Sequence, residues 1–166
     1  MDNDRVRQTI LEMFEQRGYT DIDDTDENCI LATKPDEMKI CAFPSIITKL
    51  NISEIHAHIA KMEEMKIKHS LIVHIGTPTS AVNNIVDTVP NMRMTIELFH
   101  ADDLQFNITK HYLQPKFELV KGEFKEKNKL PSMLRSDPIA RFYNYQRGSV
   151  VKVTRRNSTV SFRVVK

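Results

Sequence analysis

Two hydrophobic periodicities alternate over residues 1–100. Apolar residues that recur three and four positions apart predict three helices, at residues 4–17, 53–66 and 77–89. Short apolar runs or strict alternation predict four strands, at residues 29–33, 38–43, 71–75 and 92–98. The acidic stretch at residues 21–27 is predicted to be a loop. Strands that alternate with helices indicate an α/β layer domain.

The third of these helices is predicted to begin at a Thr-Pro pair. Thr77 can cap the helix through its hydroxyl group. Pro78 suits the first helical position, because the N–H that proline lacks would have no partner there. We therefore expect the amino terminus of this helix at residue 77.

A short helix and two strands are predicted near the carboxyl terminus. Asp137 can cap the helix, and Pro138 occupies its first position. Ile139, Phe142 and Tyr143 lie at positions i, i+3 and i+4, so they form one apolar face.

The segment after this helix is predicted to turn and then form a β-hairpin. Arg147-Gly148 favours a tight turn, since glycine adopts a positive φ easily. β-branched residues predict strands at residues 150–153 and 161–165, on either side of a polar turn at Asn157. The predicted fold class is therefore α+β, with an α/β domain at residues 1–105 and a small β-rich domain at residues 106–166.

Composition fits a globular chain. The chain has 166 residues, of which 40% are hydrophobic and 28% charged, so a packed core is expected. No apolar run approaches the roughly 18 residues that a membrane span requires. Because the first residues are acidic and the two cysteines make no disulfide framework, we expect an intracellular protein without a secretory signal.

Charge is distributed unevenly along the chain. The net charge is +2, yet seven basic residues and no acidic one follow Asp137. A basic end on an acidic body is typical of a chain whose end meets a polyanion or an acidic protein. A solvated strand face would explain the same pattern, and charge alone does not separate these interpretations.

A metal-dependent nuclease is the alternative that the residues suggest. Glu37 and Lys39 would point the same way from one strand, and Asp24 and Asp26 precede them. Many phosphodiesterases hold Mg²⁺ between an Asp and a Glu, with a nearby Lys beside the attacking water. Ordinary surface charges at a hairpin turn explain the pattern equally well. A stand-alone DNA-binding protein is a further alternative.

Metal and cofactor motifs are missing from the sequence. His56 and His58 lie two positions apart on a predicted helix and point to different sides. His74, inside an apolar strand, is expected to be a hydrogen-bonded core residue. The four glycines are scattered, so no phosphate-binding loop is expected. We therefore expect no metal, no cofactor and no catalytic residue.

Several spaced motifs near the carboxyl terminus resemble one protein family. The motifs are the Leu130-Pro131 pair, the Asp137-Pro138-Ile139-Ala140-Arg141 helix, the Gln146-Arg147-Gly148 turn and the strand at residues 150–155. Together they resemble the fifth-largest subunit shared by the eukaryotic nuclear DNA-directed RNA polymerases, a family with a shorter archaeal counterpart. The segments at residues 120–128 and 156–159 are shorter than the family's, which would suit a homologue encoded by a large DNA virus.

The resemblance extends toward the amino terminus. Residues 107–111 match the family's N-[IV]-T-x-H junction, and residues 77–81 resemble its T-P-S-A motif with one extra residue. The eukaryotic family has an amino-terminal jaw domain, which the archaeal counterpart lacks and which is similar in fold to certain nucleases without their activity. The resemblance thus implies a non-catalytic, hetero-oligomeric subunit whose partners are the largest polymerase subunit, the rest of the polymerase and, weakly and without sequence preference, downstream duplex DNA.

The resemblance also implies two sets of site residues. The subunit interface would comprise Asp137, Pro138, Ile139, Arg141, Tyr143, Arg147, Gly148, Val150, Lys152 and Arg155. The residues that face downstream DNA would be Thr77, Pro78, Ser80 and Ala81. No membrane contact is implied, and the compartment would be the nucleus for a cellular protein, or the host cytoplasm or virion for a viral one.

Overall fold

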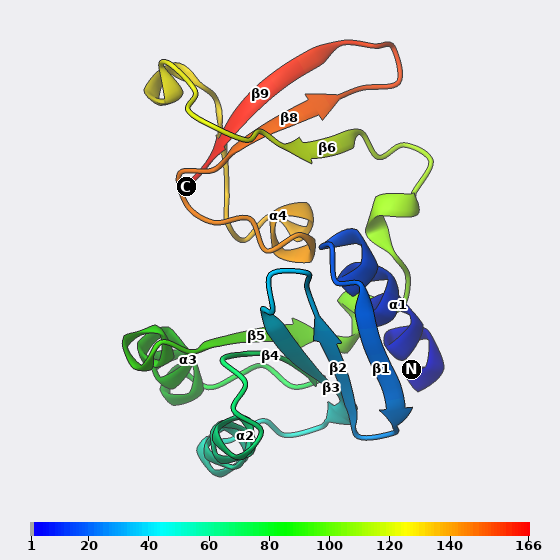
Figure 1. Cartoon of the computed structure of the whole chain (residues 1–166), viewed down its shortest axis with the longest axis vertical. Helices are drawn as coiled ribbons and strands as arrows, with labels where there is room; N and C mark the ends of the chain where they lie inside the picture. The colour runs from blue at the N-terminus through cyan, green and yellow to red at the C-terminus, as the bar shows by residue number, and fades with distance from the viewer. Residues whose placement is uncertain (1) are drawn as a thin grey trace. The chain divides into compact units, whose positions relative to one another are not determined.

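The chain forms two compact units, Met1–Phe106 and Asn107–Lys166 (Figure 1). The structure, a computed structural model, describes residues 2–166, apart from the side chains of residues 91 and 92. Within these residues the fold is a mixture of α and β, with two sheets and four α-helices. No helix in residues 2–166 combines the length and apolar character needed to cross a membrane.

The first unit is built on a five-stranded sheet in the order β1-β2-β3-β4-β5. The strands are β1 (Asp21–Asp26), β2 (Cys29–Thr33), β3 (Lys39–Ile47), β4 (His69–His74) and β5 (Thr95–His100). The first three strands pair antiparallel, whereas β3, β4 and β5 run parallel. The parallel half therefore needs crossover helices, and the antiparallel half needs only short turns.

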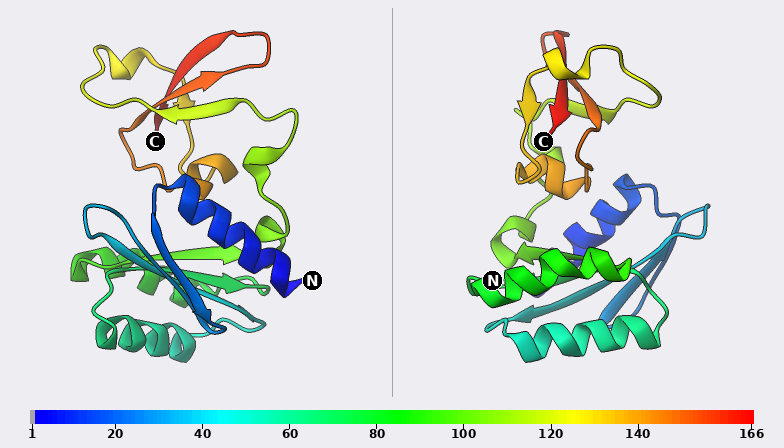
Figure 2. Two further views of the ribbon diagram at one scale, coloured as in Figure 1. Left: turned by 45° about the vertical axis from the view of Figure 1, so that its right-hand side comes forward. Right: turned by 90° about the vertical axis from the view of Figure 1, so that its left-hand side faces the viewer.

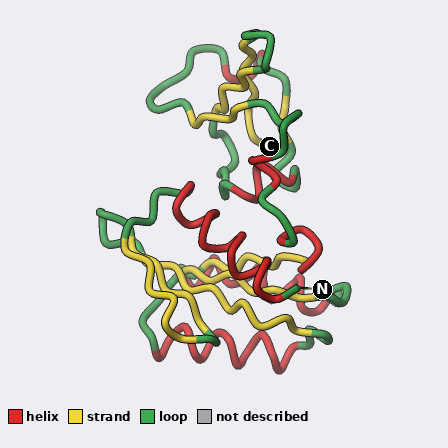
Figure 3. The backbone as a smooth tube through the Cα atoms, turned by 90° about the vertical axis from the view of Figure 1, so that its right-hand side faces the viewer, coloured by secondary structure: helices red, strands yellow, loops and turns green. Residues whose placement is uncertain are grey.

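Helices cover both faces of this sheet. Helix α1 (Asn3–Gln16) lies on one face, and α2 (Ile52–Glu64) and α3 (Ser80–Thr88) lie on the other (Figures 2 and 3). The sheet thus has buried side chains on both sides, which explains why five consecutive residues of β4 are buried.

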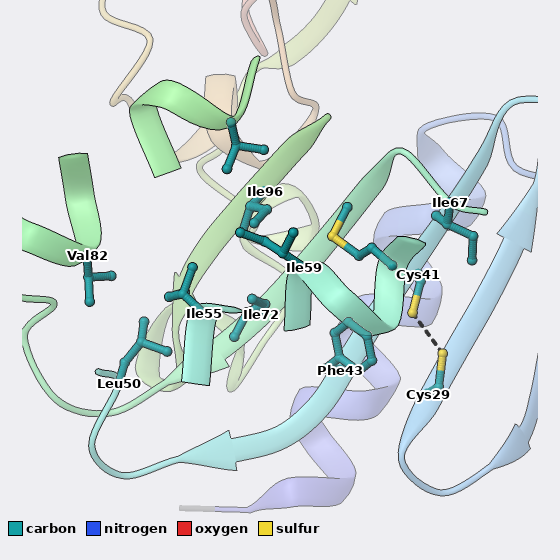
Figure 4. Packing of buried hydrophobic residues seen from close by; sticks show 12 residues of the cluster. Cys29, Cys41, Phe43, Leu50, Ile55, Ile59, Ile67, Ile72, Val82 and Ile96 are labelled. Atoms are coloured by element: carbon teal, nitrogen blue, oxygen red, sulfur yellow. Dashed lines mark hydrogen bonds between the residues drawn. The ribbon is translucent and has the colours of Figure 1, made fainter. Parts of the chain in front are cut away.

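The core beneath α2 and α3 is apolar. Ile55, Ile59 and Met62 of α2 pack with Ile72 of β4 and Val82 of α3 (Figure 4). Two free cysteines lie at the edge of this cluster, Cys29 on β2 and Cys41 on β3, with their sulfur atoms 2.8 Å apart.

Helix α1 begins and ends close to the predicted positions. The side chain of Asp2 accepts hydrogen bonds from the N–H groups of Asp4 and Arg5, which caps the helix. The apolar residues at helical spacing, Ile10 and Phe14 among them, are fully buried. The 3.6-residue period therefore located this helix correctly.

The acidic stretch at residues 21–27 forms strand β1, so the predicted loop is wrong. Backbone pairing with β2 sets its register, with Asp21 opposite Thr33 and Asp23 opposite Leu31. The strand lies at the edge of the sheet, where charged side chains remain solvated and discourage pairing with other chains. The guanidinium of Arg7 binds the carboxylate of Asp24, which offsets part of the negative charge.

The third helix begins later than predicted. Thr79, not Thr77, is the cap, and its hydroxyl accepts a hydrogen bond from the N–H of Val82 at 3.3 Å. Thr77 and Pro78 therefore lie in the preceding loop. A threonine stands on each side of Pro78, and the second one, Thr79, caps the helix. The next predicted strand, residues 92–98, is displaced to Thr95–His100 by a 3-10 turn at Val89–Met92.

The second unit has a four-stranded sheet in the order β6-β8-β9-β7 and one short α-helix. Its elements are β6 (Lys116–Leu119), β7 (Ser132–Met133), α4 (Pro138–Phe142), β8 (Val150–Thr154) and β9 (Val160–Val165). A small cluster that includes Met133, Ile139, Ala140, Tyr145, Val151 and Val165 forms its core.

The predicted features of this unit are present. The side chain of Asp137 accepts a hydrogen bond from the N–H of Ile139 at 2.9 Å, and so caps α4. Gly148 has a φ of 81°, as the tight turn requires. The carbonyl of Pro131 accepts a hydrogen bond from the N–H of Val164 at 3.0 Å, which fixes the Leu-Pro segment beside β9.

Candidate functional site

The predicted subunit-interface residues divide into a buried group and an accessible group. Ile139 and Val150 are each 3% exposed and belong to the interior of the second unit. Pro138, Arg147, Gly148 and Arg155 are exposed, and the remaining four (Asp137, Arg141, Tyr143 and Lys152) are partly exposed. Buried members of the motif therefore shape the surface, while the accessible members can contact a partner.

Aromatic residues support the α4 segment from inside. The rings of Tyr143 and Tyr145 stack with centroids 5.2 Å apart. Burial raises the pKa of both hydroxyl groups, and a hydrogen bond with Thr109 partly opposes the rise at Tyr143. Both tyrosines are therefore neutral at physiological pH, as their burial requires.

The Arg147-Gly148 turn lines a pocket of about 440 Å³ in the second unit, here called the Arg147 pocket. Leu119, Gly122 and Lys127 form its other side. A backbone hydrogen bond of 2.9 Å from the N–H of Val120 to the carbonyl of Val150 holds the two sides together. Arg147 is exposed and forms no ion pair with any of residues 2–166, so its charge is available to a partner.

Large apolar side chains stand exposed on the second unit, and sequence reasoning missed them. Exposed fractions are 70% for Tyr112, 61% for Leu113, 51% for Leu119, 63% for Leu134 and 44% for Val160. These exposed apolar side chains are candidates for contact with another protein. Unlike the predicted motif residues, these side chains follow no periodicity, so only the three-dimensional structure identifies them.

The residues predicted to face DNA lie together after the carboxyl end of β4. Thr77, Ser80 and Ala81 are exposed, and Pro78 is partly exposed. Ser80 and Ala81, the first two residues of α3, are exposed, and the first turn of a helix favours an anion.

Two histidines fix the base of this loop. The ring of His74 hydrogen-bonds the carbonyl of Gly76 at 2.7 Å, and the ring of His100 hydrogen-bonds the carbonyl of Ile75. A side chain at Gly76 would meet the carbonyl oxygen of Thr48 at 3.0 Å, so glycine permits the close approach. His74 is a hydrogen-bonded core residue, as predicted, whereas sequence reasoning assigned no role to His100.

The residues of the nuclease alternative do not converge. Asp26 pairs with Cys29 at one end of β2, and Lys39 pairs with Thr33 at the other end. Four residues of strand separate the two positions by about 13 Å, so Lys39 lies too far from this aspartate to stand beside the water of a Mg²⁺ ion that it holds. No cluster of histidine, cysteine or acidic residues suited to a metal occurs within residues 2–166.

Comparisons with known proteins give one consistent result. A family model for "RNA polymerase Rpb5, C-terminal domain" matches residues 106–165. A protein of Invertebrate iridescent virus 6 with the provisional name DNA-directed RNA polymerase subunit 454R is 34% identical over 180 residues, which cover 93% of this chain and 95% of the relative.

Eukaryotic relatives span the same length. DNA-directed RNA polymerase subunit 5-like protein 1 of Arabidopsis thaliana is 29% identical, over 93% of this chain and 89% of the relative. Subunit RPABC1 of RNA polymerases I, II and III from Caenorhabditis briggsae is 28% identical, over 97% of this chain and 94% of the relative. The chain therefore belongs to the RNA polymerase subunit 5 (Rpb5) family of non-catalytic subunits of DNA-directed RNA polymerases.

Proposed function

We propose that the second unit docks this chain on the largest polymerase subunit, and that the first unit serves as a jaw beside downstream duplex DNA. The main observation in support of docking is the Arg147 pocket. Exposed Arg147 and exposed Leu119 both line it, and both lie in the segment that the Rpb5 model matches. In this proposal the chain supplies position and assembly, while catalysis and its Mg²⁺ belong to the two largest subunits. The compartment is then that of the polymerase, the nucleus for a cellular enzyme and the host cytoplasm or virion for a viral one.

The Arg147 pocket has the composition of a protein–protein contact. Leu119 offers apolar area at 51% exposure, and Arg147 offers a planar charged group that pairs well with a carboxylate. Interfaces combine such apolar anchors with arginine more often than the rest of a protein surface does. The occupant that fits is an extended segment of the largest subunit carrying an apolar side chain and an acidic one.

Co-purification tests the docking half. The tagged chain is expressed in its native source, and the wild type should recover the two very large subunits. Arg147→Glu should lose most of this recovery, because it places a carboxylate against the expected acidic residue. Arg156→Glu makes the same charge change at an exposed arginine outside the predicted interface and should leave recovery unchanged. Equal recovery by both variants would contradict the proposal.

Support for the jaw half comes from residues 77–81, which include the start of α3. Thr77, Ser80 and Ala81 are exposed there, and the first N–H groups of a helix have no partner within the helix. Such a terminus attracts phosphate oxygens but reads no bases, so contact should be weak and independent of sequence. Duplex binding by the free chain should therefore fall with salt at a slope that reflects only a few phosphates.

A pair of substitutions on one helix tests the DNA contact. Ser80→Glu places a negative charge at the amino terminus of α3 and should weaken binding to a labelled duplex in fluorescence anisotropy. Asn84→Glu adds the same charge at an exposed position one turn further along and should weaken binding less. Equal loss in both variants, or tight sequence-selective binding by the wild type, would contradict the jaw assignment.

A further inference from the structure

The amino-terminal edge of the parallel strands holds a basic hollow that neither proposed contact uses. This hollow, here called the amino-edge pocket, has a volume of about 560 Å³. Lys39, Lys66, Lys68 and Arg93 line it, together with Tyr19 and Met38. Residues 77–81 follow the opposite, carboxyl-terminal edge of the same strands, so the pocket and the expected DNA contact lie on opposite edges of the sheet.

Topology brings these distant residues together. Lys39 is the first residue of β3, Lys68 directly precedes β4, and Arg93 precedes β5 by two positions. The register pairs Cys41 with Ser70 and His69 with Thr95, so the amino ends of three parallel strands are level. Since neighbouring strands lie about 4.8 Å apart, the positive charges gather on one short edge.

The cations of this pocket lack the ion pairs found elsewhere in the chain. All four are exposed, and none forms a salt bridge with any of the described residues. Among the described residues that line the pocket, Glu37 is the one carboxylate, against four cations. A concave surface with a large excess of charge of one sign focuses the field and favours a partner of opposite charge.

Backbone conformation at the rim of the pocket also favours a binding role for its charged side chains. Glu37, Lys66 and Arg93 have φ values of 65°, 55° and 59°, in the left-handed region that few residues other than glycine adopt. Lys66 follows the end of α2, a position where glycine is usual. Long charged side chains therefore occupy two turns that glycine would form more easily, and both side chains border the pocket.

Apolar groups in the pocket argue against a simple phosphate site. Met38 is 54% exposed, an unusual state for a large apolar side chain in the first unit, and its flexible thioether adapts to varied partners. The ring of Tyr19 forms part of the wall, and the ammonium of Lys34 lies 4.9 Å from its centre. An occupant that uses the whole pocket must offer both acidic groups and an apolar side chain.

We propose that the amino-edge pocket binds an acidic peptide segment of a partner protein, with an apolar side chain against Met38 and carboxylates against Lys39, Lys68 and Arg93. The pocket has the size of a site for a small ligand or a few side chains, whereas a duplex rests on a broader surface. Catalytic sites of parallel sheets lie at the carboxyl ends of the strands, so a site at the amino ends suits docking better than chemistry. This inference does not depend on how the second unit docks.

Fluorescence anisotropy with the full-length chain tests the proposal. The probe is a short fluorescein-labelled synthetic peptide in which aspartates and glutamates flank a leucine and a phenylalanine. The wild type should bind it with a Kd on the order of 10 μM at low salt. Lys39→Glu/Lys68→Glu should weaken binding about tenfold or more, whereas Lys49→Glu/Lys121→Glu, which gives the same net charge at exposed sites elsewhere, should have little effect. Circular dichroism verifies that each variant is folded.

Two further binding measurements distinguish an acidic peptide from other anionic ligands. Met38→Ser should weaken binding of this peptide but not of a peptide with the apolar residues replaced by serine. A labelled single-stranded DNA of equal charge should bind less tightly than the acidic peptide. Tighter DNA binding that Lys39→Glu/Lys68→Glu abolishes would overturn the proposal in favour of a nucleic-acid contact. Equal losses in both charge-reversal variants would overturn it as well, since they would show that attraction is not localised to the pocket.

Discussion

The two units bury their apolar residues to different degrees. The first unit packs helices on both faces of its sheet, and among its described side chains the exposed large apolar ones are Met38, Ile52 and, at its carboxyl end, Phe106. The second unit has a small core and leaves Tyr112, Leu113 and Leu134 more than half exposed. A small unit with exposed apolar surface is expected to be marginally stable until a partner covers it. We infer that the first unit is stabilised internally and the second by assembly.

An internal ion pair gives the largest expected effect. In the first unit, the guanidinium of Arg17 makes two hydrogen bonds of 2.7 and 2.8 Å to the carboxylate of Glu97, whose side chain is 12% exposed. Arg17→Met should lower the free energy of unfolding of this unit by about 3 kcal/mol, because the buried carboxylate would lose its permanently charged partner and keep only its contact with His69. Urea unfolding measures the loss.

The matched control removes both charges. Arg17→Met/Glu97→Leu should regain most of the lost stability, because no unpaired carboxylate then remains. If the double variant were as unstable as Arg17→Met, packing and not charge would explain the effect. The second unit should unfold as in the wild type in either case.

The same carboxylate predicts a pH dependence. Burial alone would raise the pKa of Glu97, but the charge of Arg17 and hydrogen bonds from His69 and Arg17 hold it at about 2, below the usual 4.5. This stabilisation is complete above pH 4.5 and is lost as the pH falls toward 2. The full loss is about 3 kcal/mol. Urea midpoints measured across this range should fall in the wild type and stay flatter in Arg17→Met/Glu97→Leu.

A smaller effect is expected from the cap of α4 in the second unit. Asp137→Ala removes the acceptor for the N–H of Ile139 and should cost about 1 kcal/mol. Asp137→Asn retains an acceptor and should cost much less. Hydrogen exchange should report the loss at α4 and not in the first unit. Equal destabilisation by the two variants would show that the charge of Asp137, not its cap, matters.

The smallest effect on stability is expected for Leu134→Ser, which should impair assembly and leave folding almost unchanged. Leu134 is 63% exposed, so Leu134→Ser should change the free energy of unfolding of the free chain by less than about 0.5 kcal/mol. Recovery of the large polymerase subunits should nevertheless decrease, because apolar contact area is lost. A clear destabilisation of the free chain with normal recovery would assign Leu134 to the fold instead.

Local patterns predicted the elements whose side chains obey a simple period or a special turn. The apolar stripe of α1, the Asp137-Pro138 helix start and the glycine turn at residue 148 are examples, because each depends on neighbours in sequence. Strand β1 was predicted to be a loop from its acidic composition, but backbone pairing with β2 outweighs that composition. The start of α3 was misplaced because Thr77 and Thr79 are both capable caps.

Sites assembled by topology were beyond sequence reasoning. The amino-edge pocket collects Lys39 from the start of β3 with Lys68 and Arg93 from just before β4 and β5, and nothing in their local sequence predicts that they meet. Arg147, Gly148 and Val150, which line the Arg147 pocket, belong to the motif, whereas Leu119 and Gly122 come from a segment without a clear sequence pattern. The family resemblance implies that the motif is a subunit interface, and the structure adds which of its residues are accessible.

Hydrogen exchange of the free chain and of the assembled polymerase tests the inferred difference between the units most directly. Amides at residues 119–122 and 147–150, which border the Arg147 pocket, should exchange much more slowly in the polymerase than in the free chain. Amides of β3 and β4 in the first unit should change little, because helices already cover both faces of these strands. Unchanged exchange around the Arg147 pocket, with new protection confined to the first unit, would contradict the account.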